Sequence, residues 1–535
     1  MQHNGWDHAL KVTADGAGLV GHAGAVLLRK AADQAGLTAG LAAALRKAGK
    51  WPVFDRGVVL VSVGAAIALG ATSMSDIAVL VHLAPVLGDA PSAPTVRRAL
   101  GMAGTPAMLD RIARARARAR ARVWQLIEDT TAGFPWLVIA GKALTGWLVI
   151  DLDATLVTAS SDKEGAAPTW KKGYGFHPLG AWLANTRECL AMLLRPGNAG
   201  SNTFTDHKQV LAAALRQVPA RFRNKMLVRV DGAGASHELI KHLLSLSSAR
   251  RTVLFTCGWM ITAADEDAIR QVPAGAWQPG TSQDGTAEDD KDVAEVTDLM
   301  TRAGNWPDGL RWIARRVKPS RRHLRNLTSY EKKTGWKYSI TCTNIPDTGI
   351  KGVPGSHHPQ YIDTVHREHA VVETGGVRTA KAMGLRNLPS KSWQVNCGWV
   401  IAEHSRRPDR LDPPPRLLRR RGTQGSRPGH APLPDLAHPR PHGPSCPAAD
   451  PEDQPRLAVE GGVSHLLAAA LRPARTYLTS TNYPSDARGG TTPAQSELVR
   501  TRARRAPPRN RSRQSNRHHT RNRAMAQSVT GPQER

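Results

Sequence analysis

The pattern of apolar and polar positions divides the chain into a helical beginning and a strand-rich middle. In residues 1–140 alanine and leucine dominate, and apolar positions recur at helical spacing from Ala25 to Leu45. The most apolar stretch, Gly57–Leu69, is shorter than the ~20 residues that span a bilayer, so it predicts a buried helix and no membrane span. We therefore expect a helical N-terminal domain.

Two basic segments of this helical region are candidates for DNA contact. Around residues 75–100, an apolar segment, a short turn and a basic helix match a helix-turn-helix, although an ordinary helical hairpin fits at least as well. Next, Arg111–Arg122 (RIARARARARAR) distributes its arginines around a helix, which either contacts phosphates or is a solvated surface. The predicted DNA-contacting residues are Arg97, Arg98, Arg114, Arg116, Arg118 and Arg120.

From Gly146 onwards the pattern changes to strands in alternation with helices. The predicted strands are Leu148–Val157, Glu188–Leu194 and Met226–Val230, and the predicted helices are His207–Val218 and Ser236–Leu246. Such alternation is typical of an α/β fold with a mostly parallel sheet covered by helices, where functional groups gather at the carboxyl ends of strands.

The acidic, glycine-rich stretch 263–310 interrupts this alternation and predicts an exposed loop or insertion. Strand-like runs return at Leu310–Val317 and Trp336–Thr343, and a helical segment follows from about Thr364 to Ala382. The predicted divisions are a helical, DNA end-binding region at 1–140, the first part of the core at 141–262, a β-rich insertion at 263–357, C-terminal core helices at 358–403 and a tail at 404–535.

Charge and composition predict a polyanionic partner and a disordered C-terminal tail. The 73 Lys and Arg residues exceed the 44 Asp and Glu residues and give a formal net charge of +29, which attracts polyanions, so nucleic acid is the first partner to consider. After Glu403 lysine no longer occurs, while arginine remains frequent and about half of the 37 prolines are found there. This composition predicts a disordered tail, and the abrupt loss of lysine favours a frameshifted reading frame over a genuine nucleic-acid-binding arm.

Acidic residues close two of the predicted strands. Asp151 and Asp153 lie on the same face of an apolar strand, where unpaired carboxylates need a cation, a base or solvent, with a salt bridge as the structural alternative. Asp231 ends the next parallel strand before a glycine-rich turn. Two carboxylates from adjacent strands and a third from a helix can hold two Mg²⁺ ions about 3.5–4 Å apart, which is an arrangement that cuts phosphodiesters.

Six segments carry a family resemblance: IDLDATLV (150–157), KKGYGFHPL (171–179), LRPGNAGSNT (194–203), LVRVDGAG (227–234), SYEKKTGWKYSITCTN (329–344), and HREHAVVE with KAMGLRNLPSKSWQVNCGW (366–399). Together they resemble a DDE transposase of the insertion-sequence 1380 family, in the insertion-sequence 4-related group, over about residues 10–402. The resemblance implies a ribonuclease H-like α/β fold, with a mixed sheet flanked by helices and a β insertion between the second Asp and the Glu, and cut-and-paste transposition at terminal inverted repeats. It also implies double-stranded DNA ends and target DNA as partners, a homodimer in a synaptic complex, and a bacterial, cytoplasmic, nucleoid-associated location.

The same resemblance assigns roles to individual residues. Asp153, which precedes Ala-Thr, Asp231 and Glu373 correspond to the three catalytic acids that bind two Mg²⁺ ions, for which Mn²⁺ can substitute. Related transposases have a Tyr-x-x-Arg-x-x-x-Glu signature with a Lys seven residues further on. Here histidines replace the Tyr and the Arg, and the Lys falls eight residues after the Glu; the possible accessory residues are therefore His366, His369, Lys381 and Asp151.

Two alternatives stay open at this stage. A strand ending in Asp151-x-Asp153-x-Thr155 also resembles a haloacid dehalogenase-like phosphatase, in which Asp151 would be the nucleophile and Asp153 the general acid. The phosphatase needs a further acidic pair for Mg²⁺, which is missing from the turn after Asp231.

The second alternative is a DNA-binding transposase remnant that retains its acids but has lost the C-terminal helices that support them.

Overall fold

The computed structural model describes residues 12–13, 22–46, 52–232, 234–300, 306–321, 323–405 and 457–458, which all belong to one compact unit, Met1–Arg475. The predictions of disorder and of a frameshift after residue 403 therefore fall almost entirely outside the described residues. Among the residues that are described, no helix combines the length and the apolar character that crossing a membrane requires. A short parallel pair joins strands β1 (Val12–Thr13) and β16 (Leu457–Ala458).

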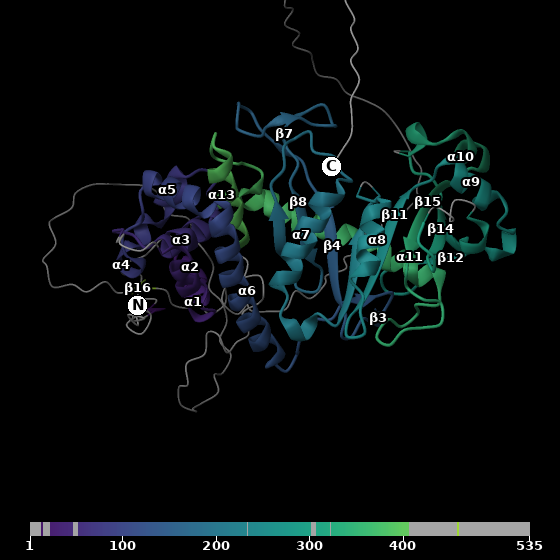
Figure 1. Cartoon of the computed structure of the whole chain (residues 1–535), viewed down its shortest axis with the longest axis horizontal. Coiled ribbons are helices and arrows are strands. Elements are labelled where there is room, and N and C mark those ends of the chain that lie inside the picture. Colours follow the sequence, from purple (N-terminus) through teal and green to yellow (C-terminus); the bar gives the residue numbers. More distant parts are fainter. Residues whose placement is uncertain are drawn as a thin grey trace, which may run out of the picture. The chain divides into compact units, whose positions relative to one another are not determined.

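The N-terminal part of the described chain is helical, as predicted (Figure 1). Its elements are α1 (Ala25–Gln34), α2 (Leu37–Leu45), α3 (Arg56–Ala68), the 3₁₀ helix η1 (Ser75–Leu83), α4 (Ala84–Leu87), α5 (Ala93–Ala103) and α6 (Pro106–Glu128). The run from Ala25 to Leu45 is two helices, because Gly36 takes a left-handed conformation with φ of 75°. Helix α3 is buried on most of its positions, which confirms that its apolar stretch is a core helix.

The candidate helix-turn-helix has one true helix, α5, preceded by 3₁₀ turns and the single turn of α4. Val96 and Leu100 of α5 are buried against α13 (Trp393–Ser405). The two helices pack closely, since a Cβ atom at Gly398 would lie 2.2 Å from the Leu100 carbonyl oxygen. Helix α5 is therefore a packing element on one side, and its opposite side remains accessible.

A sheet of nine strands forms the centre of the core, in the order β12-β13-β14-β15-β11-β10-β4-β8-β9. The strands are β4 (Leu148–Ala154), β8 (Leu179–Leu183), β9 (Glu188–Leu193), β10 (Lys225–Val230), β11 (Thr252–Met260), β12 (Gln278–Thr281), β13 (Ala287–Glu295), β14 (Arg311–Val317) and β15 (Lys337–Thr343). Parallel pairing joins β4, β10 and β11, whereas the other neighbours are antiparallel. The sheet is mixed, as the expected fold class states, and the mostly parallel pairing that the local alternation of strands and helices suggests is limited to β4, β10 and β11.

The expected exposed loop at 263–310 is another correction, because much of this stretch is regular. It contains helix α9 (Ala263–Arg270) and strands β12 and β13, which continue the central sheet through β14 and β15. Acidic side chains of β13 pair with arginines of β14, with Asp292 2.7 Å from Arg316 and Glu295 2.8 Å from Arg311. Cross-strand charge pairs of this kind stabilise a strand that lacks an apolar pattern.

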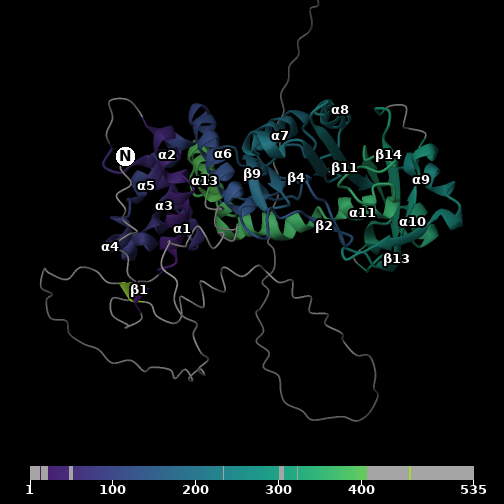
Figure 2. The ribbon, with the colours of Figure 1, turned by 90° about the horizontal axis from the view of Figure 1, so that it is seen from below.

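Helices cover both faces of the sheet (Figure 2). On one face lie α7 (Phe204–Gln217) and α8 (His237–Ser245), and on the other lies α11 (Pro359–Arg367). Ile150 and Leu152 of β4 belong to the apolar cluster on the α7 side, whereas Val149 belongs to the cluster that includes α11. Alternation along β4 therefore directs Asp151 and Asp153 to the α11 side, which confirms that they share a face.

The helical segment predicted at Thr364–Ala382 differs from the structure in both its start and its regularity. Helix α11 begins at Pro359 and ends at Arg367, and the chain then forms two π-helical turns at Val372–Val377 and Lys381–Leu385 with a short α-helical turn between them. The second π turn contains a kink at Gly384, whose φ is 104°. The first of these widened turns contains Gly375 and Gly376, and glycine weakens a helix by about 1 kcal/mol relative to alanine.

Candidate catalytic site

Asp153 and Asp231 lie at the carboxyl ends of two adjacent parallel strands, as the sequence predicts. The register of β4 and β10 pairs Leu152 with Val230. Asp153 is the residue after Leu152 in β4, and Asp231 directly follows the last residue of β10. Asp153 is 9% exposed, and Asp231 is partly buried in the turn that follows β10. The backbone N–H of Gly234 donates a 3.1 Å hydrogen bond to the Asp231 carboxylate and closes that turn.

The electrostatic environment of Asp153 disfavours its charged form. Burial, followed by the negative charges of Asp231, Glu373 and Asp151, raises the pKa of Asp153 to about 7, against the opposing effect of His369. Like charges and a low-dielectric environment both destabilise a carboxylate that has no counter-charge. Asp153 is therefore an acid whose ionised form needs a cation.

Asp151 has the opposite environment, although it lies two residues away on the same face. It is fully buried, and Arg229 of the neighbouring strand donates Nε to Oδ1 at 2.6 Å and Nη2 to Oδ2 at 2.9 Å. His369 donates Nδ1–H to Oδ1 at 2.9 Å. Burial alone would raise the pKa of Asp151, but the charge of Arg229 and the bond from His369 hold it below its ordinary range.

Two histidines fasten the chain after α11 to the sheet. His369 reaches β4 through Asp151, while Nδ1 of His366 lies 3.1 Å from the Thr256 hydroxyl on β11. A Cβ atom at Gly258 would lie 2.2 Å from Nε2 of His366, so this glycine makes room for the ring. Burial and then the nearby positive charges lower the pKa of His366 to about 3, which keeps it neutral. Both residues therefore help to place the segment that carries Glu373.

Glu373 itself is exposed and lies on the π-helical turn Val372–Val377. It lines a hollow of about 670 Å³ together with His366 and His369, and it is near enough to Asp153 to raise the pKa of that acid. Within the described residues no three His, Cys, Asp or Glu side chains are grouped closely enough to bind one metal ion. The structure therefore places Glu373 within electrostatic range of Asp153. It does not group the three acids around one metal ion among the described residues.

Lys381, the other possible accessory residue, also faces this neighbourhood. Its side chain is partly buried, and burial lowers its pKa against the stabilising negative charge of Asp153. The lysine is thus in electrostatic range of the buried acid despite its displaced spacing in the sequence.

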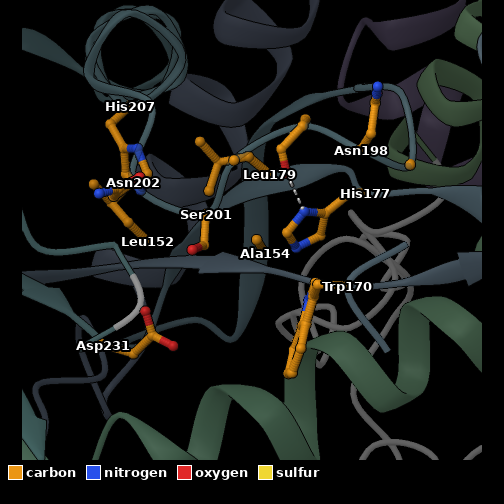
Figure 3. Close-up of a pocket in the computed structure, with 13 residues that line it drawn as sticks. Leu152, Ala154, Trp170, His177, Leu179, Asn198, Ser201, Asn202, His207 and Asp231 are labelled. Atoms are coloured by element: carbon orange, nitrogen blue, oxygen red, sulfur yellow. Dashed lines mark hydrogen bonds between the residues drawn. The ribbon is translucent and has the colours of Figure 1, made fainter. Parts of the chain in front are cut away.

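A second hollow, of about 530 Å³, opens on the other side of Asp231 (Figure 3). The ends of β4 and β10 form its floor, the loop 197–202 forms one wall, and Trp170 stands at its rim. His177 and His207 also line it, and burial lowers the pKa of both rings. His177 and His207 therefore lie near the second acid.

The predicted DNA-contacting arginines divide into two groups. Arg120 is buried and forms a 2.7 Å ion pair with Glu188 of β9, and Arg116 is buried enough that its pKa falls to about 10. The expectation that Arg120 faces DNA was wrong, because this side of α6 packs against the core, whereas Arg116 is partly buried and its contact with DNA stays a prediction. The other group is exposed, and DNA contact stays a prediction for its members, which are Arg97, Arg98, Arg114 and Arg118.

The residues fit a divalent cation by the chemistry of their donors. Carboxylate oxygens are the ligands that Mg²⁺ prefers, and the raised pKa of Asp153 reflects its burial and the negative charges of Asp231, Glu373 and Asp151, which His369 offsets only in part. Arg229 forms its ion pair with Asp151. The structure thus separates Asp151, a structural acid, from Asp153, Asp231 and Glu373, whose oxygens are of the kind that Mg²⁺ prefers although these acids are not grouped around one ion among the described residues.

Sequence reasoning missed the role of Arg229 and the contribution of Trp170 and His207. One signal was available for Arg229, since a charged residue inside the apolar strand MLVRV requires a buried partner. No local pattern identifies that partner, because Asp151 lies 78 residues earlier.

The fold and the site define an α/β protein with acids gathered at the carboxyl ends of adjacent strands in a large mixed sheet flanked by helices. A family model described as transposase DDE domain, group 1, matches residues 2–402, so the chain belongs to the DDE transposases. Among solved structures, one that it resembles is the cryo-EM structure of the piggyBac transposase synaptic complex with hairpin DNA. That match has 11% identity and a TM-score of 0.38, and covers 74% of this chain and 75% of the other. No curated protein sequence matches.

Proposed function

We propose that this protein is a DNA transposase that cuts and joins DNA strands at the terminal inverted repeats of an insertion sequence. The observation that carries the proposal is the buried Asp153, whose pKa is raised to about 7 by burial and by the negative charges of Asp231 and Glu373, in a chain of the DDE transposase family. A ribonuclease H-like core and membership of the insertion-sequence 1380 family are part of the same proposal. A nucleoid-associated location in a bacterial cytoplasm follows from such an activity.

In this mechanism Asp153, Asp231 and Glu373 would hold two Mg²⁺ ions, for which Mn²⁺ can substitute. When bound, the ions activate the attacking oxygen and stabilise the leaving oxygen of a phosphodiester. Asp151 has no part in that binding, because Arg229 and His369 occupy both of its oxygens. Its task is to hold β4, β10 and the segment after α11 together.

DNA contact outside the acid group falls to the exposed arginines of the N-terminal helices. Arg97 and Arg98 lie on the accessible side of α5, and Arg114 and Arg118 lie on the accessible side of α6. Side chains of this type neutralise phosphates without reading the base sequence. The proposed partners are duplex DNA carrying the inverted repeats, target DNA and a second copy of the chain in a synaptic complex.

The test is cleavage of DNA that carries the element's ends. Asp153→Asn, Asp231→Asn and Glu373→Gln should each abolish Mg²⁺-dependent cutting and leave end binding within about twofold. The matched control is Asp267→Asn, an acid on α9 with a side chain 61% exposed, which should cut normally. Normal cutting by any of the three acid variants would contradict the assignment of that residue, and loss of binding in all three would show that the acids are structural.

One observation favours a second candidate, the DNA-binding remnant. The three acids are not grouped for metal binding in the described chain, and Glu373 sits on a widened helical turn. This chain should be compared with one in which a continuous helical frame replaces the residues after 403. Equal rates of Mg²⁺-dependent cutting by the two chains would reject the remnant, whereas cutting by the restored chain alone would support it.

The phosphatase alternative receives no comparable support. A nucleophilic aspartate needs an accessible oxygen, but Asp151 is 0% exposed and both of its oxygens accept hydrogen bonds. An attack on a phosphate would require the Arg229 ion pair to break first. The structure therefore gives Asp151 and Asp153 different environments, which the short motif Asp-x-Asp cannot distinguish.

A further inference from the structure

The hollow beside Asp231 is built from three segments that the chain folds tightly together. The strands β6 (Ala167–Pro168) and β7 (Tyr174–Phe176) form a hairpin that bears Trp170 near its tip. The loop that follows β9 packs against this hairpin without space for a side chain, since a Cβ atom at Gly197 would lie 2.3 Å from the Ala167 carbonyl oxygen and 2.4 Å from that of Gly175. The hairpin and the loop therefore form one continuous wall above the ends of β4 and β10.

Hydrogen-bond acceptors face this hollow. Nδ1 of His177 lies 2.9 Å from the Ala199 carbonyl oxygen, and Nδ1 of His207 lies 3.0 Å from the Thr203 carbonyl oxygen. Because a carbonyl oxygen can only accept, each Nδ1 carries the proton, and Nε2 of each neutral ring is an acceptor. The Asp231 carboxylate turns toward the same space (Figure 3).

The side-chain amides of the loop 197–202 add both donors and acceptors. Asn198 and Asn202 line the hollow from this loop. A ligand with N–H groups and carbonyl oxygens on one edge suits such a lining. A phosphate does not suit the floor, because Asp231 would repel it.

Trp170 supplies an aromatic surface at the rim of the hollow. Its side chain is 70% exposed, and in the described part of the chain no other tryptophan is an exposed residue. The Lys171 ammonium lies 4.8 Å from the centre of the ring, and Lys172, also exposed, is held with φ of 59°, a left-handed conformation that lysine rarely adopts. Two hydrogen bonds, from Thr169 N to Gly173 O at 2.8 Å and from Lys172 N to Thr169 O at 2.9 Å, fix this turn.

We propose that this hollow binds one unpaired nucleotide of the DNA strand next to Asp231, with its base against Trp170 and the adjoining phosphates at Lys171 and Lys172. An exposed aromatic ring beside lysines is the arrangement that binds single-stranded nucleic acid through base stacking and phosphate contact. A volume of about 530 Å³ accepts a nucleotide, whereas a paired base is stacked on both faces and cannot reach the ring. The inference rests on the proposed function, because that function supplies DNA as the substrate.

The experiment measures DNA binding without cutting. Two labelled probes share one duplex sequence: the first is blunt, and the second ends in an unpaired 3′ stretch that contains 2-aminopurine. Anisotropy in EDTA reports affinity, and 2-aminopurine emission reports stacking. Trp170→Ala should weaken binding of the overhang probe about tenfold, the loss of one base–aromatic stack, while binding of the blunt probe changes less than about twofold.

Two further variants control the comparison. Trp170→Phe keeps an aromatic face and should restore most of the affinity and of the emission change. Leu324→Ala removes another exposed apolar side chain, 51% exposed, outside the residues that line the hollow, and should have no effect. Equal weakening of both probes by Trp170→Ala, or no weakening of either, would overturn the proposal.

The outcome is independent of whether the chain cuts DNA. Failure of the proposed function appears as absence of Mg²⁺-dependent cleavage by the wild-type chain, whatever the overhang does. Failure of the nucleotide site appears as equal affinity of wild-type chain and Trp170→Ala for the overhang probe, whatever the cleavage assay gives.

Discussion

Replacement of Asp151 by Asn tests how the candidate site is held together. The Asp151 and Arg229 side chains are 0% and 1% exposed, and Nη1 of the arginine also donates to the Val365 carbonyl oxygen at 3.0 Å. Asp151→Asn would leave the guanidinium buried without a counter-charge. Breaking a buried pair in this way costs about 3–5 kcal/mol, so the free energy of unfolding should fall by that amount.

The assay is urea unfolding at neutral pH, followed by tryptophan fluorescence. Asp151→Asn combined with Arg229→Met removes both charges and should recover a large part of the loss, because the two effects are coupled. Asp267→Asn is the matched control: it disrupts an ion pair with Arg270 whose side chains are 61% and 53% exposed, and it should cost less than about 1 kcal/mol.

The pH of the measurement matters for the sign of the effect. Because the pKa of Asp151 is lowered in the folded chain, the stability from its pair is fully present above the unfolded value of about 3.9. That stability is lost as the pH falls through the lower, folded pKa. At neutral pH the contribution is complete, so a loss below about 1 kcal/mol for Asp151→Asn would refute the reasoning.

The remaining predictions concern Asp153 and helix α6. The pKa of Asp153 is raised to about 7, so the stability it contributes is present below about pH 4 and lost as the pH rises through 7. Asp153→Asn should therefore stabilise the metal-free chain at pH 8 by up to about 4 kcal/mol in thermal unfolding and by little at pH 4; equal effects at both pH values would contradict the raised pKa. Mg²⁺ should raise the melting temperature of the wild-type chain and not of this variant, which differential scanning fluorimetry measures. The double variant Arg114→Ala/Arg118→Ala should weaken DNA binding and reduce its salt dependence without changing the free energy of unfolding. Arg120→Met should lower the free energy of unfolding. Loss of DNA binding in Arg120→Met, together with normal binding in the double variant, would show that α6 presents its other side to DNA.

The strands that carry the aspartates were predictable from the sequence, because their apolar runs end in acids. Leu148–Val157 and Met226–Val230 correspond to β4 and β10, and their parallel pairing places Asp153 beside Asp231. The third acid was placed by resemblance alone. Its local structure is a π-helical turn that contains Gly375 and Gly376, residues that weaken a regular helix.

Other features could not be predicted from the sequence, because the residues that stabilise them lie far away along the chain. Strand β13 contains AEDDKDVAE, which lacks an apolar alternation and becomes a strand through ion pairs with β14. The arginines of α6 alternate uniformly with alanine, so no local pattern separates Arg120, which meets Glu188, from the exposed Arg118. Period and composition predict an element's type, whereas tertiary partners decide which of its charged residues are buried.

The contrast between Asp151 and Asp153 follows from one arginine. Both acids extend from the same face of β4, and the parallel register sets Arg229 opposite Asp151. Two residues further along β4, Asp153 stays on that face, whereas Asp231 lies in the turn after β10 and lines the hollow on the α7 side, so the paired arrangement is not repeated there. A shift of the register by one residue would turn one set of side chains to the opposite face and break the pair. The buried ion pair therefore fixes the register that brings Asp153 and Asp231 to the same end of the sheet.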